Sequence, residues 1–169
     1  MINPRQLHDL IVKPTLSQIG LDQPGASQLL MGTYLHESTV GGDTCVKQLG
    51  GGPALGIYQM EPATHNDIWK NYLKYKEELA SYVLTAIGLD SDNLPDAERM
   101  IWDLKYATCM ARVHYRRDPG ILPASTDLIA QAEYYKKVYN THLGAATPDD
   151  FKKAVLKSGI KDLWGIRSV

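Results

Sequence analysis

The chain has 169 residues, enough for one domain with a substantial core and too few for two ordinary domains. Its formal net charge is -1 and its sequence pI is about 6.5, so it lacks the basic excess that is typical of nucleic-acid-binding proteins. We therefore expect a single domain over residues 1–169 and no nucleic-acid partner.

The opening residues, MINPRQLHDLIVK, mix polar and apolar side chains and lack the continuous apolar run of a secretory signal. No apolar stretch approaches the ~20 residues that a membrane-spanning helix needs. The two cysteines, Cys45 and Cys109, are too few for a disulfide framework. We expect two free thiols, with a single bridge between them as the alternative, and neither a signal peptide nor a membrane span.

Apolar residues recur at i, i+3 and i+4 along most of the chain and seldom alternate with polar residues, which predicts a mainly α fold. A first helix is expected to begin at Pro4 and to be interrupted near Pro14, because proline lacks the amide hydrogen that a helix interior requires. A second helix is expected to open at Pro24 or Gly25.

The second helix is expected to end near a glutamate. Leu30, Tyr34 and Glu37 fall at i, i+4 and i+7 and thus on one stripe, which puts Glu37 on the buried side of the helix end. The following residues, 40–53, are rich in glycine, including a GG and a GGG run, which ends helices and permits unusual backbone angles. This segment is predicted to be a loop or a small β-hairpin.

Later helices are marked by caps and breakers. Pro62 is the expected first position of one helix, and another is expected from Glu77 to Ile87, ending at Gly88. A central helix is expected over residues 97–115, since its small residues allow neighbouring helices to approach closely. Two C-terminal helices are expected, the first capped by Ser125 or Thr126 and the second by Thr147.

Glu37 is the candidate general acid. An apolar surrounding raises the pKa of a carboxyl group and keeps it protonated near neutrality, so that it can donate a proton to a leaving oxygen. The alternative interpretation is an ordinary solvated glutamate at a helix end.

Two motifs in order carry a resemblance to a known family. The pair Glu37-Ser38 is followed, across the glycine-rich segment, by GIYQMEPAT at residues 56–64. This arrangement resembles the goose-type lysozyme and soluble lytic transglycosylase superfamily, in which a Glu-Ser pair precedes a G-[LI]-x-Q-x-x-P-x-T segment. The resemblance implies a lysozyme-like, mainly α domain with a small loop or β-hairpin region beside the active-site cleft.

The resemblance also implies roles for individual residues. Glu37 would be the catalytic acid and Ser38 would help to orient it. Gly56 would be a backbone position near the sugar, and Tyr58 and Gln59 would line the saccharide cleft. The alternatives are core packing for Tyr58 and a solvated turn for Gln59.

A second similarity lies in EYYKKVYNTHLG, because the family commonly carries a Tyr-Asn pair on a late helix that faces the acid. Tyr139 and Asn140 are similar to that pair, although His142 and Leu143 intervene before the glycine. Tyr139 ends an inward stripe, so we expect its hydroxyl to hydrogen-bond the Glu37 carboxyl. A core tyrosine followed by an asparagine cap is the alternative. The stripe comprises Leu128, Ala132, Tyr135 and Tyr139.

Hydrolysis by the two-carboxylate route requires a partner for Glu37. Asp43 is the nearby candidate in the sequence, with a solvated turn residue as the alternative, and nothing local marks Asp67 or Asp103. Transglycosylases of the family manage without a second carboxylate, because the N-acetyl group of the substrate and its 6-hydroxyl complete the reaction. The lack of an evident partner thus favours a lyase.

Other site chemistries lack support. The five histidines include no i, i+4 pair and no HExxH motif, so we predict no metal site. Neither a GxxxxGK[ST] phosphate loop nor a GxSxG nucleophile elbow occurs, and no cofactor is expected.

The resemblance predicts a lytic transglycosylase that cleaves the β-1,4 bond between N-acetylmuramic acid and N-acetylglucosamine in peptidoglycan glycan strands. The alternatives are a hydrolytic muramidase that uses Asp43 and a catalytically silent virion structural protein with this fold. The lack of a signal sequence and of a wall-binding module favours a bacteriophage protein. It would be carried in the virion beside other virion proteins, or released from the host cytoplasm to act on the periplasmic cell wall.

Overall fold

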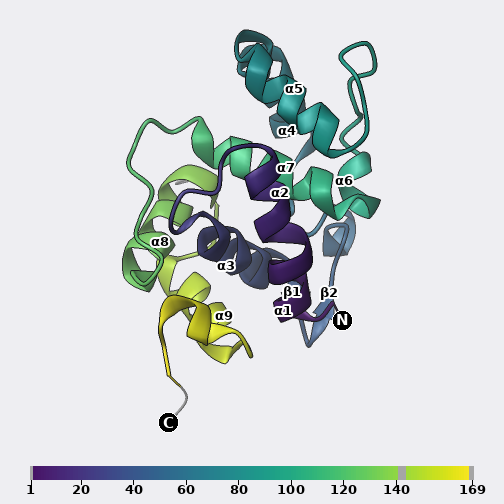
Figure 1. Ribbon diagram of the computed structural model, residues 1–169. Helices are drawn as coiled ribbons and strands as arrows, with labels where there is room; N and C mark the ends of the chain where they lie inside the picture. Colours follow the sequence, from purple (N-terminus) through teal and green to yellow (C-terminus); the bar gives the residue numbers. More distant parts are fainter. Residues whose placement is uncertain (1, 141–143, 168–169) are drawn as a thin grey trace.

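The computed structural model describes residues 2–140 and 144–167, and it is mainly helical with a two-stranded antiparallel sheet, as predicted (Figure 1). Elements η1 and η4 are π-helical and the other η elements are 3-10 helices. In chain order the elements are α1 (Pro4–Gln6), η1 (Leu7–Val12), α2 (Lys13–Gln18), α3 (Ala26–Ser38), β1 (Thr39–Val40), β2 (Asp43–Thr44), η2 (Leu49–Gly51), α4 (Pro62–Asn71), η3 (Leu73–Tyr75), α5 (Glu77–Ala86), α6 (Arg99–Trp102), α7 (Leu104–Arg116), α8 (Leu128–Tyr135), η4 (Lys136–Asn140), α9 (Pro148–Lys157) and η5 (Lys161–Trp164).

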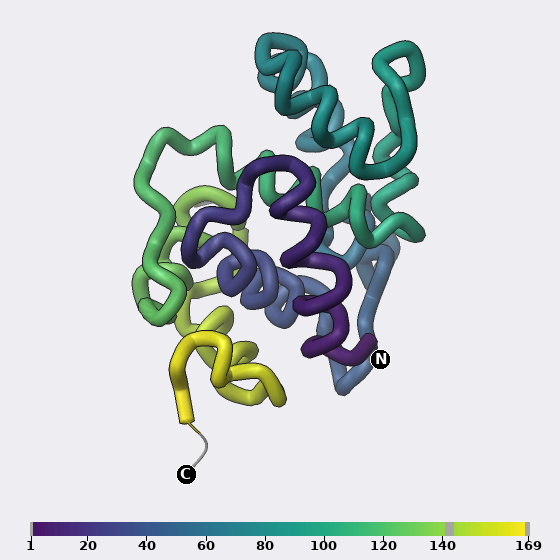
Figure 2. The backbone as a smooth tube through the Cα atoms, viewed as in Figure 1, coloured from purple at the N-terminus to yellow at the C-terminus, as the bar shows by residue number. Residues whose placement is uncertain are grey.

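Helix α7 lies at the centre of the molecule, as expected for the helix with small residues. It packs against α2, α3, α4 and α5, and most of its side chains are buried. Figure 2 shows α5 and residues 88–98 as two arms that project from the main body of the protein. No helix in the described part of the chain is both long enough and apolar enough to cross a membrane.

The expected break near Pro14 is wrong, because the chain stays helical from Pro4 to Gln18. The turn before Pro14 is a π-helix, in which the Lys13 amide donates to the His8 carbonyl, five residues back. This wider turn leaves Pro14 in the first turn of α2, where a missing amide hydrogen costs little.

The expected helix over 97–115 is two helices, because Asp103 leaves helical geometry between α6 and α7. Its carboxylate accepts a hydrogen bond from the Tyr106 amide and so caps α7. Asp127, not Ser125 or Thr126, caps α8. The expected helix starts at Pro62 and at Thr147 are confirmed, the latter with a complete capping box.

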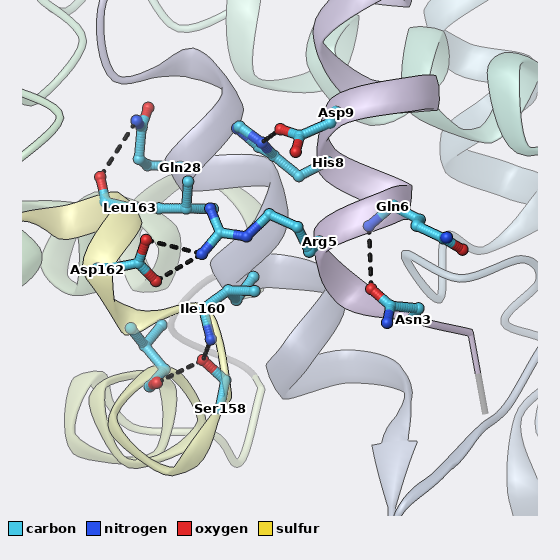
Figure 3. A network of polar contacts seen from close by, with 11 residues as sticks. Asn3, Arg5, Gln6, His8, Asp9, Gln28, Ser158, Ile160, Asp162 and Leu163 are labelled. Carbon is cyan, nitrogen blue, oxygen red and sulfur yellow. Dashed lines mark hydrogen bonds and ion pairs between the residues drawn. The ribbon is translucent and has the colours of Figure 1, made fainter. Parts of the chain in front are cut away.

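The C-terminal segment packs against α1 and α3. The Arg5 guanidinium donates to both carboxylate oxygens of Asp162, at 2.6 and 2.7 Å, and the Gln28 amide donates to the Leu163 carbonyl (Figure 3). Since both ionic side chains are well exposed, this pair fixes geometry more than it adds stability.

Helices α3 and α9 approach closely at Gly32. A Cβ atom at this position would lie 2.1 Å from the Phe151 ring, so only glycine lets the ring of α9 rest on the backbone of α3. Phe151 in turn lies 5.0 Å from the Tyr135 ring, centroid to centroid. This packing brings α8 to the end of α3, where Glu37 lies.

Candidate active site

A cavity of about 720 Å³ opens beside the end of α3. Four residues of α3, α7 and η4 form one wall, and we call this the acid wall. The other part of the lining, which we call the turn wall, comes from residues 40–64. The acid wall comprises Glu37, His114, Tyr139 and Asn140, and the turn wall includes Cys45, Gln48, Gln59, Glu61 and Thr64. A larger groove of about 970 Å³ between α4 and α5 contains none of the predicted site residues.

Glu37 is half-buried at the cavity wall and is held by a tyrosine. The Tyr135 hydroxyl donates to Glu37 Oε1 at 2.5 Å. The second carboxyl oxygen, Oε2, is not engaged by this hydroxyl. Desolvation raises the pKa of Glu37, and the hydrogen bond from Tyr135 offsets part of that rise. The carboxyl group therefore stays protonated at higher pH than a solvated glutamate does.

Tyr135 is itself fixed by rings on three sides. Its ring lies 5.0 Å from Phe151, 6.1 Å from Tyr139 and 5.3 Å from His36, measured between centroids. Burial and the nearby Glu37 carboxylate raise the pKa of Tyr135, so the phenol keeps its proton and remains a donor. Such packing fixes the position of the phenol oxygen beside Glu37.

A chain of polar contacts leads from Lys136 through Asn140 to Tyr135. Lys136 Nζ donates to Asn140 Oδ1 at 2.9 Å and to the Gly144 carbonyl at 2.7 Å. With its oxygen taken, the Asn140 side chain presents its amide nitrogen, and its hydrogen bond to Tyr135 lowers the pKa of that phenol. Asn140 therefore supports the acid through Tyr135 while it also borders the cavity.

The turn wall is supported by residues 56–59, which form a tight turn between Leu55 and Met60 and of which Gln59 lines the cavity. The amides of Leu55 and Met60 donate to each other's carbonyls at 2.9 and 3.0 Å. Gly56 has φ +72°, and a Cβ atom there would lie 2.5 Å from the Met100 carbonyl oxygen. Glycine is thus required at this position both by the backbone angle and by the space.

Gln59 has φ +47° and is the sole non-glycine residue with a positive φ in the described ranges. Its side-chain amide donates to the Gly56 carbonyl at 2.9 Å, which holds the side chain at the cavity. A glutamine in this region costs about 1–3 kcal/mol and persists where the surrounding structure imposes it. Such strain is concentrated at functional sites.

Three predicted residues support the site instead of lining it. Ser38 is buried and donates to the Ile57 carbonyl, which ties the acid's helix to the turn. Tyr58 is also buried, and its hydroxyl pairs with Thr108 at 3.2 Å. None of Ser38, Gly56 and Tyr58 lines the cavity, so the expected lining role of Tyr58 is corrected to a positioning role, and the expected role of Ser38 in orienting the acid stays a prediction.

The predicted hydrogen bond between Tyr139 and Glu37 is also wrong. Tyr139 lines the cavity, but its hydroxyl donates to the Tyr58 carbonyl at 2.8 Å, and Tyr135 takes the expected place beside the acid. The helix turns π-helical at residue 136, and Tyr139 in this turn reaches the backbone of the 56–59 turn instead. The predicted spacing after the Tyr-Asn pair involves His142 and Leu143, which lie outside the described residues.

The carboxylates considered as partners for Glu37 lie elsewhere. Asp43 is exposed on β2, Asp67 pairs with Arg117 at 2.6 Å, and Asp103 caps α7; none lines the cavity. Glu61 lines it instead, from the segment directly before α4. The sequence motif assigned no role to Glu61, although the sequence shows this carboxylate two residues after the motif glutamine, Gln59.

The thiols are free, as expected: Cys45 lines the cavity and Cys109 is buried in α7. Within the described ranges, no three His, Cys, Asp or Glu side chains are grouped as a metal ion would require. The chain matches no protein-family model, no curated protein and no solved structure.

Proposed function

We propose that the chain is a peptidoglycan lytic transglycosylase that cleaves the β-1,4 bond between N-acetylmuramic acid and N-acetylglucosamine, with Glu37 as general acid and base. One observation carries the proposal: a desolvated carboxyl group is held by Tyr135 at the wall of a polar cavity that Gln59 also lines. The resemblance of Glu37-Ser38 and residues 56–64 to the transglycosylase superfamily supplies the substrate class.

In the proposed reaction, Glu37 donates its proton to the glycosidic oxygen as the bond from that oxygen to the muramic acid C1 breaks. The raised pKa favours this step, because the acid must be protonated to donate. The N-acetyl group of the substrate stabilises the positive centre at C1. The 6-hydroxyl oxygen then attacks C1 and gives its proton to Glu37, which restores the acid and leaves a 1,6-anhydro end.

A hydrolytic muramidase is the second candidate, and the position of Glu61 favours it over the version with Asp43. Glu61 shares the cavity with Glu37, so its carboxylate is available to activate a water molecule, whereas Asp43 does not line this cavity. In that reaction water attacks C1, its proton passes to the base, and the product has a reducing end.

Digestion of purified peptidoglycan tests both candidates, with mass spectrometry of the released muropeptides. Glu37→Gln keeps the size of the side chain and removes the transferable proton, so we expect a loss of about 10²–10⁴-fold in a folded protein. Glu77→Gln, an exposed change on α5, is the matched control and should digest like the wild type. Retention of a tenth of wild-type activity by Glu37→Gln would falsify the role of Glu37.

The product ends separate the two reactions. A lyase gives 1,6-anhydro ends and tolerates Glu61→Gln, whereas a hydrolase gives reducing ends and loses most of its rate in that variant. Asp43→Asn should match the wild type under either reaction, since Asp43 is exposed and away from the cavity.

The biological setting is proposed from the sequence alone. We propose a bacteriophage protein that is carried in the virion, or released from the host cytoplasm, to act on the periplasmic wall. If wild type and Glu37→Gln both fail to digest peptidoglycan while remaining folded, the silent virion structural protein becomes the better account.

A further inference from the structure

His114 is a cavity residue to which the proposed reaction assigns no part. It lies on α7, and its ring meets the Tyr139 ring edge to face, with 4.9 Å between centroids and an interplanar angle of 68°. Arg117 Nη2 lies 2.7 Å from His114 Nδ1. The other end of the guanidinium, Nη1, donates to Asp67 at 2.6 Å. A line of contacts thus runs from α4 through α7 to η4.

These contacts determine the tautomer of His114. Arginine has donors and no acceptor, so His114 Nδ1 must accept from Arg117 and carries no hydrogen. A neutral imidazole then has its hydrogen on Nε2, which makes Nε2 a donor. The His114 ring packs on Tyr139, and a hydrogen bond to the Tyr139 backbone offsets part of the pKa lowering that burial causes, which is the direction expected when Nε2–H donates to a carbonyl oxygen.

Tyr139 is consequently held at two points. His114 engages its backbone, and its hydroxyl donates to the Tyr58 carbonyl in the turn wall at 2.8 Å. Tyr139 lies within the π-helical turn η4, between Tyr135 and Asn140, the two residues that support Glu37. Tyr139 is one of the rings that pack on Tyr135, at 6.1 Å between centroids, so the position of this turn contributes to where the Tyr135 hydroxyl lies.

We propose that His114, in its neutral Nε2-protonated form, is a positioning residue that fixes η4 and thereby the hydrogen bond from Tyr135 to Glu37. The effect on catalysis rests on the proposed function, whereas the effect on the position of η4 does not. Because His114 acts through the geometry of the acid, it affects turnover more than the binding of glycan.

Protonation of His114 at Nδ1 would break its contact with Arg117. Nδ1–H of an imidazolium would face the Arg117 guanidinium, and Asp67 on α4 would be the nearest compensating charge, already paired with Arg117. Tyr139 on η4 offers the ring no carboxylate. Burial, followed by the repulsion from Arg117, lowers the pKa of His114 to about 4, so the neutral form predominates at neutral pH.

Two substitutions separate the two ring nitrogens. His114→Gln keeps a donor near the place of Nε2, and His114→Asn keeps an acceptor near the place of Nδ1 but has no donor to reach Tyr139. Both lose the ring that packs on Tyr139, so their melting temperatures should fall alike. We expect turnover to fall about tenfold in His114→Asn, as for loss of one hydrogen bond, with KM within about twofold, and His114→Gln to stay near wild type.

Two measurements do not depend on activity. Hydrogen exchange of the amides of residues 136–140 should be about tenfold faster in His114→Asn than in His114→Gln. In the wild type, ¹⁵N chemical shifts should report Nε2 as protonated and Nδ1 as bare. The opposite tautomer, or equal exchange and equal turnover in the two variants, would overturn the proposal. A chain that digests no peptidoglycan would refute the proposed function alone, because the exchange and tautomer results would still stand.

Discussion

The two walls of the cavity are built by different means. The acid wall rests on packed rings, with Phe151, Tyr135, Tyr139 and Tyr115 in successive contact. The turn wall is shaped by backbone, with glycine angles and carbonyl hydrogen bonds at Gly56 and its neighbours. Packed rings fix the direction and desolvation of one acid, whereas a backbone turn fixes the shape of a surface. Substitutions in the acid wall and in the turn wall should therefore impair the protein in different ways.

The largest expected effect is on stability, at the base of the acid wall. Gly32→Ala puts a methyl group into the Phe151 ring, and overpacking of this kind costs about 3 kcal/mol. Gly159→Ala is the matched control, since a Cβ atom there meets nothing within 4 Å. Urea denaturation should show a large loss for the first variant and little change for the second. Equal stabilities would mean that α3 and α9 do not need this close contact.

The next effect concerns the Tyr135 hydroxyl, which should matter more for turnover than the Tyr139 hydroxyl. Tyr135→Phe removes the hydrogen bond to Glu37 and should lower turnover about tenfold. That bond favours the charged carboxylate, so its loss raises the pKa of Glu37 further. Since the acid must be protonated, the alkaline limb of the pH–rate profile should move to higher pH.

Tyr139→Phe is the comparison for that experiment. It removes a hydrogen bond to the Tyr58 carbonyl and should cost about 1 kcal/mol of stability while the alkaline limb stays in place. A shift of the limb in Tyr139→Phe, and none in Tyr135→Phe, would restore the sequence-based assignment of Tyr139 as the partner of Glu37.

The smallest expected effect lies in the turn wall. Gln59→Gly and Gln59→Ala both remove the amide at the cavity, but only glycine accepts φ +47° without strain. Gln59→Gly should therefore be more stable than Gln59→Ala by about 1 kcal/mol, and both should digest peptidoglycan more slowly than the wild type. Equal thermal stability of the two variants would show that the turn relaxes when the glutamine is removed.

Local signals in the sequence were sufficient for many element boundaries. Each of these signals acts on its own turn of helix: Pro62 through its fixed φ, Gly25 through its flexible backbone and Thr147 through its capping side chain. Their effects can therefore be predicted without tertiary structure. The mainly α class and the small hairpin followed from periodicity and from the glycine-rich segment.

The π-helical turns could not be predicted from the sequence, because packing and not a residue pattern stabilises them. The turn at η4 explains why Tyr135, one turn before the predicted Tyr139, supports Glu37. Tyr135 stood on the same stripe, so a pattern of i and i+4 alone did not distinguish them. The break at Asp103 had a signal, a capping residue inside an apolar pattern, which competed with a continuous helical stripe.

The two cysteines differ in a way that has practical use. Cys109 is buried at the centre of α7, where desolvation raises the pKa of its thiol to about 12 and suppresses the reactive thiolate. Cys45 is half-buried and borders the cavity that contains Glu37. A thiol reagent should consequently modify the unaltered protein at one position beside the acid. Slower labelling in the presence of glycan fragments would then measure occupancy of the cavity directly, without a radioactive or chromogenic substrate.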